Sequence, residues 1–302
     1  MTQPQSIATQ PPQWKAWLWA SRPKTLTAGV MPVLVASALA YHQWHLFSLL
    51  TLCCGLLSAL CIQIGTNYSN DALDFIRGSD TKKRVGFARA VQMGWISSSA
   101  MLKGSYLAFA LGILFSIPVA IHTPFVLGMV ILCALFSYLY TGGPYPLAYK
   151  GLGELFVILF YGWAITGTVY YAQTGFIDIS ALAAGLQLGL LSSVILALNN
   201  LRDISQDAEA NKKTLAVRFG VLFAKLEIIF CLTLVFLLNL FWWQQSAPLL
   251  AILPLASLPL ALRVATETWS TPPSASYNAI FGKAALLHIL FCTLFLTSCI
   301  LS

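Results

Sequence analysis

Charge is scarce in this chain. Lys and Arg number 17 and Asp and Glu 10 in 302 residues, so that 9% of the chain is charged and 58% is hydrophobic. Soluble globular proteins carry about 25% charged residues. This composition excludes a soluble domain with one membrane anchor. It predicts an all-α polytopic membrane protein in which residues 1–302 form a single domain.

Metal-binding patterns of cysteine and histidine are also missing. The seven cysteines lie in apolar runs without the spacing of metal ligands, and the pair His42 and His45 has helical spacing but no third ligand. A zinc or iron site and a disulfide framework are therefore not expected. The polar N-terminus lacks the basic-then-apolar start of a cleaved signal peptide, so we expect the first apolar helix to be retained.

Nine apolar segments separate the stretches that carry charge. Several fall short of the roughly 20 residues of a full membrane span, so we expect Tyr, Trp or Ser from their flanks to complete them. The segments lie at 26–41, 46–66, 98–121, 123–140, 153–174, 179–200, 222–243, 248–264 and 281–300. The sequence therefore predicts a bundle of nine transmembrane helices.

The basic residues fall on one side of these segments. All 17 precede the first segment or lie in and around the even-numbered loops, and the odd-numbered loops hold none. Under the positive-inside rule, this asymmetry predicts a multi-pass protein of the cell (inner) membrane with the N-terminus and even loops in the cytoplasm and the C-terminus outside. The net charge of +7 then sets topology and meets anionic groups, and does not indicate a nucleic-acid partner.

Two acidic clusters follow the second and sixth segments, on the predicted cytoplasmic side. Carboxylates so close to a bilayer are costly and require a partner. Spacings of i, i+3 or i+4, and i+7 place side chains on one stripe of a helix. The residues are Asn67, Asn70, Asp71 and Asp74 in the first cluster, and Asn200, Asp203 and Asp207 in the second.

Oxygen ligands alone favour a hard cation. Mg²⁺ takes one or two carboxylates together with substrate phosphates and water. Basic side chains on the same predicted face would help to hold a diphosphate and to neutralise charge as it leaves. Those residues are Arg22, Lys24, Arg84, Arg89, Arg202, Lys212 and Lys213. The alternative is that the aspartates form solvated helix ends and the basic residues only set topology.

Four stretches carry a family resemblance: 21–25, 67–80 with 84–89, 140–154, and 199–218. The pattern Asn70-Asp71-x-x-Asp74 with Asp203-x-x-x-Asp207 resembles the UbiA-type intramembrane prenyltransferases. The last two stretches are similar to the branch of that family that acts on 1,4-dihydroxy-2-naphthoate in menaquinone synthesis. The similarity in pattern covers roughly residues 15–300.

The resemblance implies a Mg²⁺-dependent prenyl transfer. A polyprenyl diphosphate would bind through two Mg²⁺ ions between the clusters and ionise, and the naphthoate would be alkylated at its carboxyl-bearing carbon with loss of CO₂, giving a demethylmenaquinol. The implied metal ligands are Asp71, Asp74, Asp203, Asp207 and Asn67. The implied substrate-binding residues are Asn70, Asn200, Tyr140 and Tyr149, with Arg22, Lys24, Arg84, Arg89, Arg202 and Lys212.

Further residues fit this chemistry. The rings of Tyr140 and Tyr149, near the inner ends of segments four and five, would tolerate an allylic cation and keep it from water. Lys150 is the only basic residue of its loop and would meet a carboxylate or the diphosphate, with a topology anchor as the alternative. Glu154 would orient a hydroxyl or help to deprotonate the ring, unless it is only a helix-start charge.

The chain departs from the family pattern within the first motif. The family often has a further aspartate four residues after the inner one of the first motif, where this chain has Gly78, with Asp80 two residues later. The role of Asp80 stays open. The loops at about 75–97 and 208–221 are too long for simple connectors, so we expect them to fold over the cavity as cytoplasmic caps.

Other functions remain open from the residues alone. A transferase that uses 4-hydroxybenzoate or another aromatic acceptor is the nearest alternative. A cation-coupled transporter or a non-catalytic lipid-binding scaffold would also place carboxylates near a membrane.

Overall fold

The computed structural model describes residues 11–80 and 85–302, and this part of the chain is helical without strands. The long helices are α2 (Pro23–Trp44), α3 (Leu49–Ile76), α4 (Ser98–Ala120), α5 (Pro124–Leu139), α8 (Ile179–Arg202), α10 (Leu215–Leu237) and α14 (Tyr277–Leu301). One composite run consists of α6 (Gly153–Val157), the π-helical η2 (Ile158–Ala164) and α7 (Ile165–Thr174), and another of α12 (Pro248–Ile252), η3 (Leu253–Ser257) and α13 (Leu258–Ser270). The short helices are α1 (Gln13–Ala20), η1 (Leu147–Lys150), α9 (Ile204–Glu209) and α11 (Asn239–Gln244).

Most of the chain forms helices of membrane length. Within the described residues, eight helices or composite runs are long and apolar enough to cross a membrane. Helix α5 has 16 residues. It is therefore about 24 Å long, short of the roughly 30 Å hydrocarbon core of a bilayer. The prediction of a polytopic all-α membrane protein is confirmed, and the count of nine spans stays a prediction.

Polar residues at the helix starts define several of these elements. Ser48, Ser97, Asp178 and Thr214 each accept a hydrogen bond from a backbone N–H in the first turn of α3, α4, α8 and α10 respectively. Such caps satisfy amide groups that have no partner within the helix. The caps Ser97 and Asp178 stand one residue before the segments predicted at 98–121 and 179–200, so these two helices begin where the sequence predicts.

Helix α8 forms the centre of the bundle. Its apolar residues, including Leu188, Leu191 and Leu198, lie in the largest cluster of buried side chains, and it packs against α10, η2 and α14. Where η2 crosses α8, glycines permit backbone contact, because a Cβ atom on Gly162 would lie 2.5 Å from the carbonyl oxygen of Gly185. Close helix contact through small residues is common in membrane bundles.

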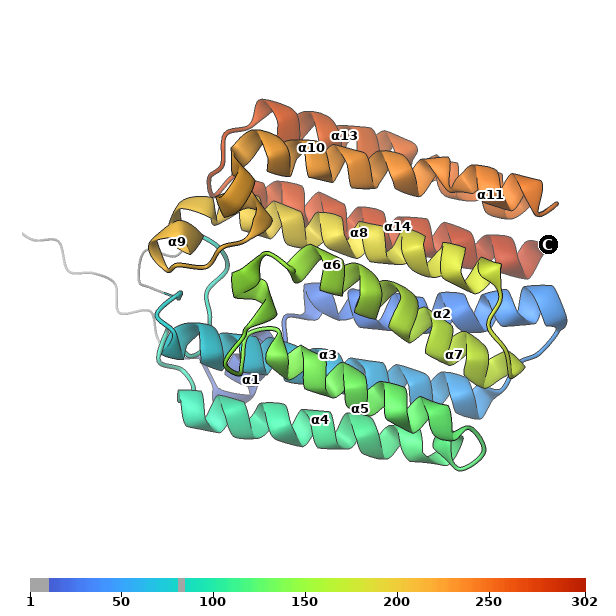
Figure 1. Ribbon diagram of the computed structural model, residues 1–302, viewed down its shortest axis with the longest axis horizontal. Coiled ribbons are helices and arrows are strands. Elements are labelled where there is room, and N and C mark those ends of the chain that lie inside the picture. The colour runs from blue at the N-terminus through green and yellow to red at the C-terminus, as the bar shows by residue number, and fades with distance from the viewer. Residues whose placement is uncertain (1–10, 81–84) are drawn as a thin grey trace, which may run out of the picture.

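The two ends of the bundle differ in chemistry. In Figure 1, α9 and the polar loops lie at one end, and the C-terminus lies at the other. Helix α1 packs beside the same end of α3 as the first acidic cluster, with the rings of Trp17 and Tyr68 5.2 Å apart. The segments that carry both acidic clusters therefore meet at one end.

Candidate active site

A cavity of about 500 Å³ lies at this polar end of the bundle. Its walls come from the α1–α2 junction, α3, the loop after α3, residues 140–148, α8, α9 and the start of α14. Eleven of the predicted site residues line it: Arg22, Lys24, Asn70, Asp74, Arg89, Tyr140, Asn200, Arg202, Asp203, Asp207 and Lys212. Both acidic clusters thus contribute to one space, as the sequence predicts.

Helix α3 forms the first acidic wall, because it continues beyond its apolar part to Ile76. Tyr149 Oη donates a hydrogen bond of 2.9 Å to Asp74 Oδ1, and Arg89 Nη2 donates one of 3.3 Å to Oδ2. Burial, and then the charge of Asp74, raises the pKa of Tyr149. The phenol therefore stays protonated and acts as a donor that orients the Asp74 carboxylate.

Two further contacts complete this wall. Thr141 donates a hydrogen bond of 2.6 Å to Asn70 Oδ1. Arg89 Nε lies 3.4 Å from Asp80 Oδ2, so that one guanidinium links Asp80 with Asp74. Asp80, whose role the sequence leaves open, lines the cavity and is buried.

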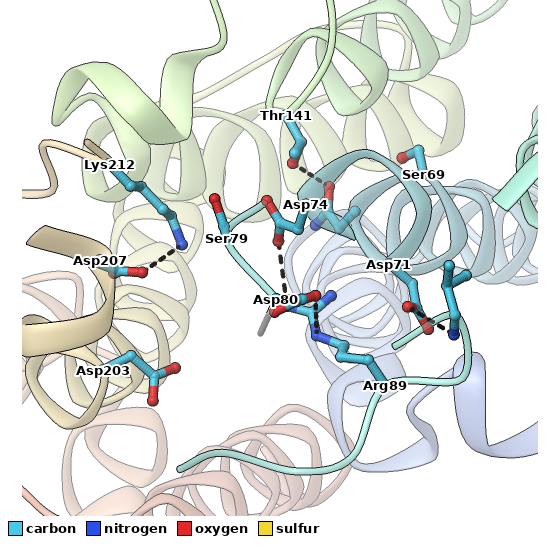
Figure 2. A network of polar contacts seen from close by, with 12 residues as sticks. Ser69, Asp71, Asp74, Ser79, Asp80, Arg89, Thr141, Asp203, Asp207 and Lys212 are labelled. Atoms are coloured by element: carbon cyan, nitrogen blue, oxygen red, sulfur yellow. Dashed lines mark hydrogen bonds and ion pairs between the residues drawn. The ribbon is translucent and has the colours of Figure 1, made fainter. Parts of the chain in front are cut away.

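The second acidic wall forms where α8 gives way to α9. Asp203 stands at this break with non-helical torsion angles (φ −93°, ψ 9°). Arg202 donates from Nε and Nη2 to its two oxygens, each at 2.7 Å. Figure 2 shows Asp203 and Asp207 across the opening from Asp74 and Asp80. The break therefore turns both aspartates toward the first wall.

Asp207 carries an oxygen that lacks a partner. Its Oδ1 lies 3.3 Å from Lys212 Nζ, but Oδ2 is buried without a hydrogen-bond partner among the described residues. Burial raises the pKa of Asp207, and the nearby Lys212 opposes this rise. A buried carboxylate oxygen without a partner is costly, and a cation at this position would offset that cost.

Asp71 turns away from the cavity (Figure 2). Its Oδ2 accepts a hydrogen bond of 3.0 Å from the backbone N–H of Ala90, and Oδ1 accepts one of 3.3 Å from Val91. The side chain is buried. Helix α3 runs unbroken through Asn67, Asp71 and Asp74, so the three residues share one stripe as the spacing predicts. Asp71 nevertheless does not face the cavity, because its carboxylate holds the loop after α3.

Asn67 and Glu154 support the site from outside the cavity. Asn67 Nδ2 donates to the carbonyl oxygen of Ser21 at 2.7 Å and to Thr25 Oγ1 at 3.1 Å, which fixes the start of α2. Glu154 is buried and its Oε1 accepts a hydrogen bond of 2.6 Å from Asn200 Nδ2. Neither residue lines the main cavity, so each positions residues that do.

Two other predicted residues lie elsewhere. Tyr149 contacts Asp74 without lining the cavity itself. Lys150 is also outside it, with Nζ 4.8 Å from the ring centroid of Tyr145. Arg84 lies outside the described residues.

Aromatic residues that the sequence does not predict as site residues also line the cavity. They are Trp19, Phe87, Trp95 and Phe281. Trp19 lies before the first predicted apolar segment, at 26–41. Phe87 lies in the stretch 84–89 that carries the family resemblance, which is a usable signal. Phe281 stands at the start of the ninth segment, and nothing in the sequence connects it with the acidic clusters.

The loop after α3 is fixed at both sides of Phe87. On one side, a Cβ atom on Gly86 would lie 2.5 Å from Arg202 Nη2, so the backbone of the loop rests directly on this guanidinium. On the other side, Arg89 reaches Asp74, and Asp71 holds the next two amides. The loop from the first cluster therefore packs onto the second cluster.

Two further cavities extend from this one into the bundle. An adjoining cavity of about 140 Å³ shares Thr25, Asn70, Tyr140, Leu196 and Asn199 with it. A third cavity, of about 90 Å³ and mostly apolar lining, shares Gln63, Ser137, Phe160 and Tyr161 with the second. The three spaces thus adjoin in series from a charged chamber to an apolar interior.

The donor set in the chamber fits a magnesium ion that is shared with a phosphate ligand. Its acidic walls present carboxylate and amide oxygens, which suit hard cations. Within residues 11–80 and 85–302, no group of three His, Cys, Asp or Glu side chains is placed to hold a metal ion. Mg²⁺ commonly takes only one or two carboxylates and completes its shell with substrate phosphates and water.

Known proteins are similar to this chain in sequence or in fold. A 1,4-dihydroxy-2-naphthoate octaprenyltransferase of Haemophilus influenzae is 38% identical over 216 residues, which cover 68% of this chain and 70% of that protein. The protein of the same name from Escherichia coli is 36% identical, over 73% of this chain and 72% of the relative. A UbiA homolog from Archaeoglobus fulgidus, solved bound to DMAPP and Mg²⁺, superposes with a TM-score of 0.67 at 16% identity, covering 95% of this chain and 99% of that one.

The family model extends over nearly the whole bundle. The model of the UbiA prenyltransferase family matches residues 29–297. This range contains α3, α8 and α9, which carry both acidic walls. The two octaprenyltransferases exceed 30% identity over more than two thirds of this chain. The chain belongs to the UbiA prenyltransferase family.

Proposed function

We propose that this protein transfers a polyprenyl group from a polyprenyl diphosphate to 1,4-dihydroxy-2-naphthoate and releases CO₂, giving a demethylmenaquinol. One observation carries the proposal: two carboxylate-bearing walls face one charged chamber, and two further cavities with mainly apolar lining adjoin that chamber in series. A diphosphate with a long apolar tail needs both environments. The acceptor follows from the names of the relatives at 38% and 36% identity.

Asn70, Asp74, Asp203 and Asp207 would hold Mg²⁺ together with the diphosphate. The orphaned Oδ2 of Asp207 supports this assignment, because a cation would satisfy it. When bound, Mg²⁺ would neutralise the diphosphate and so stabilise its departure. Asp71 is left out of the ligand set because its carboxylate holds backbone amides.

The transfer balances without an added reagent. The bond between C1 of the donor and the diphosphate oxygen breaks, and its electron pair stays with the diphosphate. The ring carbon that bears the carboxylate supplies the electron pair for the new bond to C1. The bond to the carboxylate then breaks, its electron pair returns to the ring, and CO₂ leaves. No net proton is needed when the acceptor enters as its carboxylate.

The cationic side chains have the reach to assist this departure. Arg89, Arg202 and Lys212 line the chamber and each pair with an aspartate in the structure. A diphosphate that enters with its metal would draw these cations toward its oxygens, where they stabilise the charge that develops. Tyr140 lines both the chamber and the adjoining cavity, so its ring would shield the allylic carbon from water.

The membrane arrangement is part of the proposal. The asymmetry of the basic residues supports a cytoplasmic chamber, an external C-terminus and an odd number of spans. Helix α5 would then cross the membrane in addition to the eight longer helices and runs. The loop at residues 85–91 and the segment around Lys212 would serve as cytoplasmic caps that limit entry of water. A cysteine introduced at Ser302 should be labelled from the outside of intact cells, and labelling only after permeabilisation would contradict this orientation.

Quinone analysis tests the reaction. Membranes that contain the protein should convert 1,4-dihydroxy-2-naphthoate and a prenyl diphosphate to a demethylmenaquinol that mass spectrometry detects, and chelation of Mg²⁺ should stop the conversion. Asp203→Asn is the matched inactive control, with its membrane content measured in parallel. Product from 4-hydroxybenzoate but none from the naphthoate would reject the acceptor and retain the prenyl transfer.

A further inference from the structure

One wall of the chamber joins aromatic rings to a cation. Phe87, from the loop after α3, meets Phe281 of α14 with ring centroids 5.8 Å apart. Lys24, in the first turn of α2, places Nζ 5.4 Å from the centroid of the Phe87 ring. All three side chains line the chamber, and their elements are far apart in the sequence. This wall is therefore assembled by the fold and is distinct in chemistry from the acidic walls.

Lys24 differs from other cations of the chamber. Arg89, Arg202 and Lys212 each form an ion pair with an aspartate. Lys24 forms no ion pair with any described residue, and its ammonium group lies over the ring of Phe87. The charge of Lys24 thus remains available to an anion that approaches along the aromatic wall.

Phe87 is held in place although its side chain is 45% exposed. Arg202 lies under it, with Cζ 5.9 Å from the ring centroid, and the same guanidinium supports the backbone at Gly86. Asn278 accepts a hydrogen bond of 2.8 Å from Arg202 Nη1, which ties this support to α14. A fixed ring that is exposed to the chamber offers a flat apolar surface to a ligand at low entropic cost.

We propose that Lys24 and Phe87 form the subsite for the acceptor, in which the naphthoate ring packs on Phe87 and its carboxylate pairs with Lys24 Nζ. The assignment rests on the proposed function, since it states how the acceptor of that reaction is held. An aromatic carboxylate matches this wall in both respects, by its π-face and by its charge. The acidic walls remain for the metal and the diphosphate.

The subsite also separates substrate from product. The transfer removes the carboxylate as CO₂, so the product no longer carries the group that pairs with Lys24. Charge-assisted hydrogen bonds are roughly twice as strong as neutral ones. Loss of this contact would weaken the hold on the product ring and favour its release into the bilayer.

The test is Lys24→Met, compared with Lys15→Met as its matched control. Lys15 is an exposed lysine of α1 that does not line the chamber, and its Nζ also lies 5.4 Å from an aromatic centroid, that of Trp14. We expect Lys24→Met to raise KM for the naphthoate about tenfold, with KM for the prenyl diphosphate unchanged within about twofold. Lys15→Met should leave both constants at their wild-type values.

Two competitive inhibitors separate charge from ring. Lys24→Met should raise the inhibition constant of 1-hydroxy-2-naphthoate about tenfold and leave that of 1-naphthol, which lacks the carboxylate, unchanged. Phe87→Leu should raise both constants about fivefold, because both ligands lose the aromatic contact. Equal effects of Lys24→Met on the two inhibitors would contradict a carboxylate contact.

The remaining outcomes decide between this subsite and the function on which it rests. A rise in KM for the prenyl diphosphate alone in Lys24→Met would assign Lys24 to the donor and overturn the subsite, with the transferase intact. Absence of prenylated naphthoate from the wild-type protein would reject the proposed function, and the subsite with it. Turnover by wild type, with the pattern of selective losses described for the two variants, supports both.

Discussion

The two acidic clusters resemble each other in sequence and differ in what they do. Asp203 and Asp207 both line the chamber, but Asp74 lines it while Asp71 does not. Residues three apart on a helix are separated by only about 60° around its axis, so spacing alone does not separate Asp71 from Asp74. The difference arises because the loop after α3 presents two backbone amides to Asp71. The second cluster therefore turns both of its aspartates toward the chamber, whereas the first turns one toward it and uses the other to anchor a loop.

The clusters also differ in continuity. Asn70 and Asp74 lie within one unbroken helix that ends at Ile76. Asp203 lies at a break, and Asp207 belongs to the short helix α9. The first wall is thus a helical surface, whereas the second is a corner whose two carboxylates depend on Arg202 and Lys212 for their position.

The largest expected effect is at the carboxylates that line the chamber. Asp74→Asn or Asp203→Asn should each lower kcat/KM by at least about 100-fold, because each change removes a charge that would hold the metal and diphosphate. Radiometric assay of prenyl transfer in membranes measures this. Membrane content of each variant is the control, and turnover within about twofold of wild type in both variants would contradict the enzymatic role of the clusters.

Asp71→Asn should have a smaller effect of a different kind. An amide retains one acceptor but turns an N–H toward a backbone N–H, which costs about 1–3 kcal/mol and loosens the loop that carries Arg89 and Phe87. We expect kcat/KM to fall about tenfold. The Mg²⁺ concentration for half-maximal activity should stay at the wild-type value, whereas Asp74→Asn should raise it. A rise of the same size in Asp71→Asn would restore Asp71 as a metal ligand.

Much of the helical framework was predictable from apolar runs and caps. The segments predicted at 98–121, 123–140 and 179–200 correspond to Ser98–Ala120, Pro124–Leu139 and Ile179–Arg202. The segment predicted at 46–66 ends ten residues before α3 does, because hydropathy stops at the polar cluster while the helical backbone continues. The π-helical turn of η2 was not predictable, since it depends on the close contact of Gly162 with α8.

The parts of the site that depend on residue type alone were predictable from the sequence. The oxygen ligands and basic residues of both clusters indicated a shared chamber, and most of them line it. The direction of the Asp71 side chain depends on backbone amides 19 and 20 residues later, which carry no side-chain signal. The contact of Phe87 with Phe281 joins a loop to the last helix. No spacing or motif in a single sequence indicates a contact between two residues so far apart.

The contact of Gly86 with Arg202, which joins the loop after α3 to the second cluster, provides a finer test of how the clusters depend on each other. Gly86→Ala would place a methyl group 2.5 Å from Arg202 Nη2 and push the guanidinium away from Asp203. We expect kcat/KM to fall about fivefold, because the displaced arginine no longer orients that carboxylate. Gly282→Ala is the matched control, since nothing lies within 4 Å of the added atom. Equal activities of the two variants would show that the loop and the second cluster act independently.

The smallest expected effect is on the stability of the folded protein in the absence of metal, through Asp207 in the second acidic wall. Burial raises the pKa of Asp207 above its ordinary value, although Lys212 opposes this rise. The folded state therefore holds this proton more tightly than the unfolded state does. Stability from this group is fully present below the ordinary pKa of aspartate and is lost as the pH rises through the raised value.

Asp207→Asn removes that titration. In detergent with a chelator, the midpoint of thermal unfolding of the variant should exceed that of wild type at pH 8 by about 2–4 °C per kcal/mol recovered. The difference should shrink as the pH falls, because protonation makes wild-type Asp207 resemble the amide. Asp74, which Tyr149 and Arg89 satisfy, gives the opposite expectation: Asp74→Asn should destabilise at pH 8. A loss of stability in both variants would mean that the carboxylates of Asp207 and Asp74 are equally well satisfied by protein partners without metal.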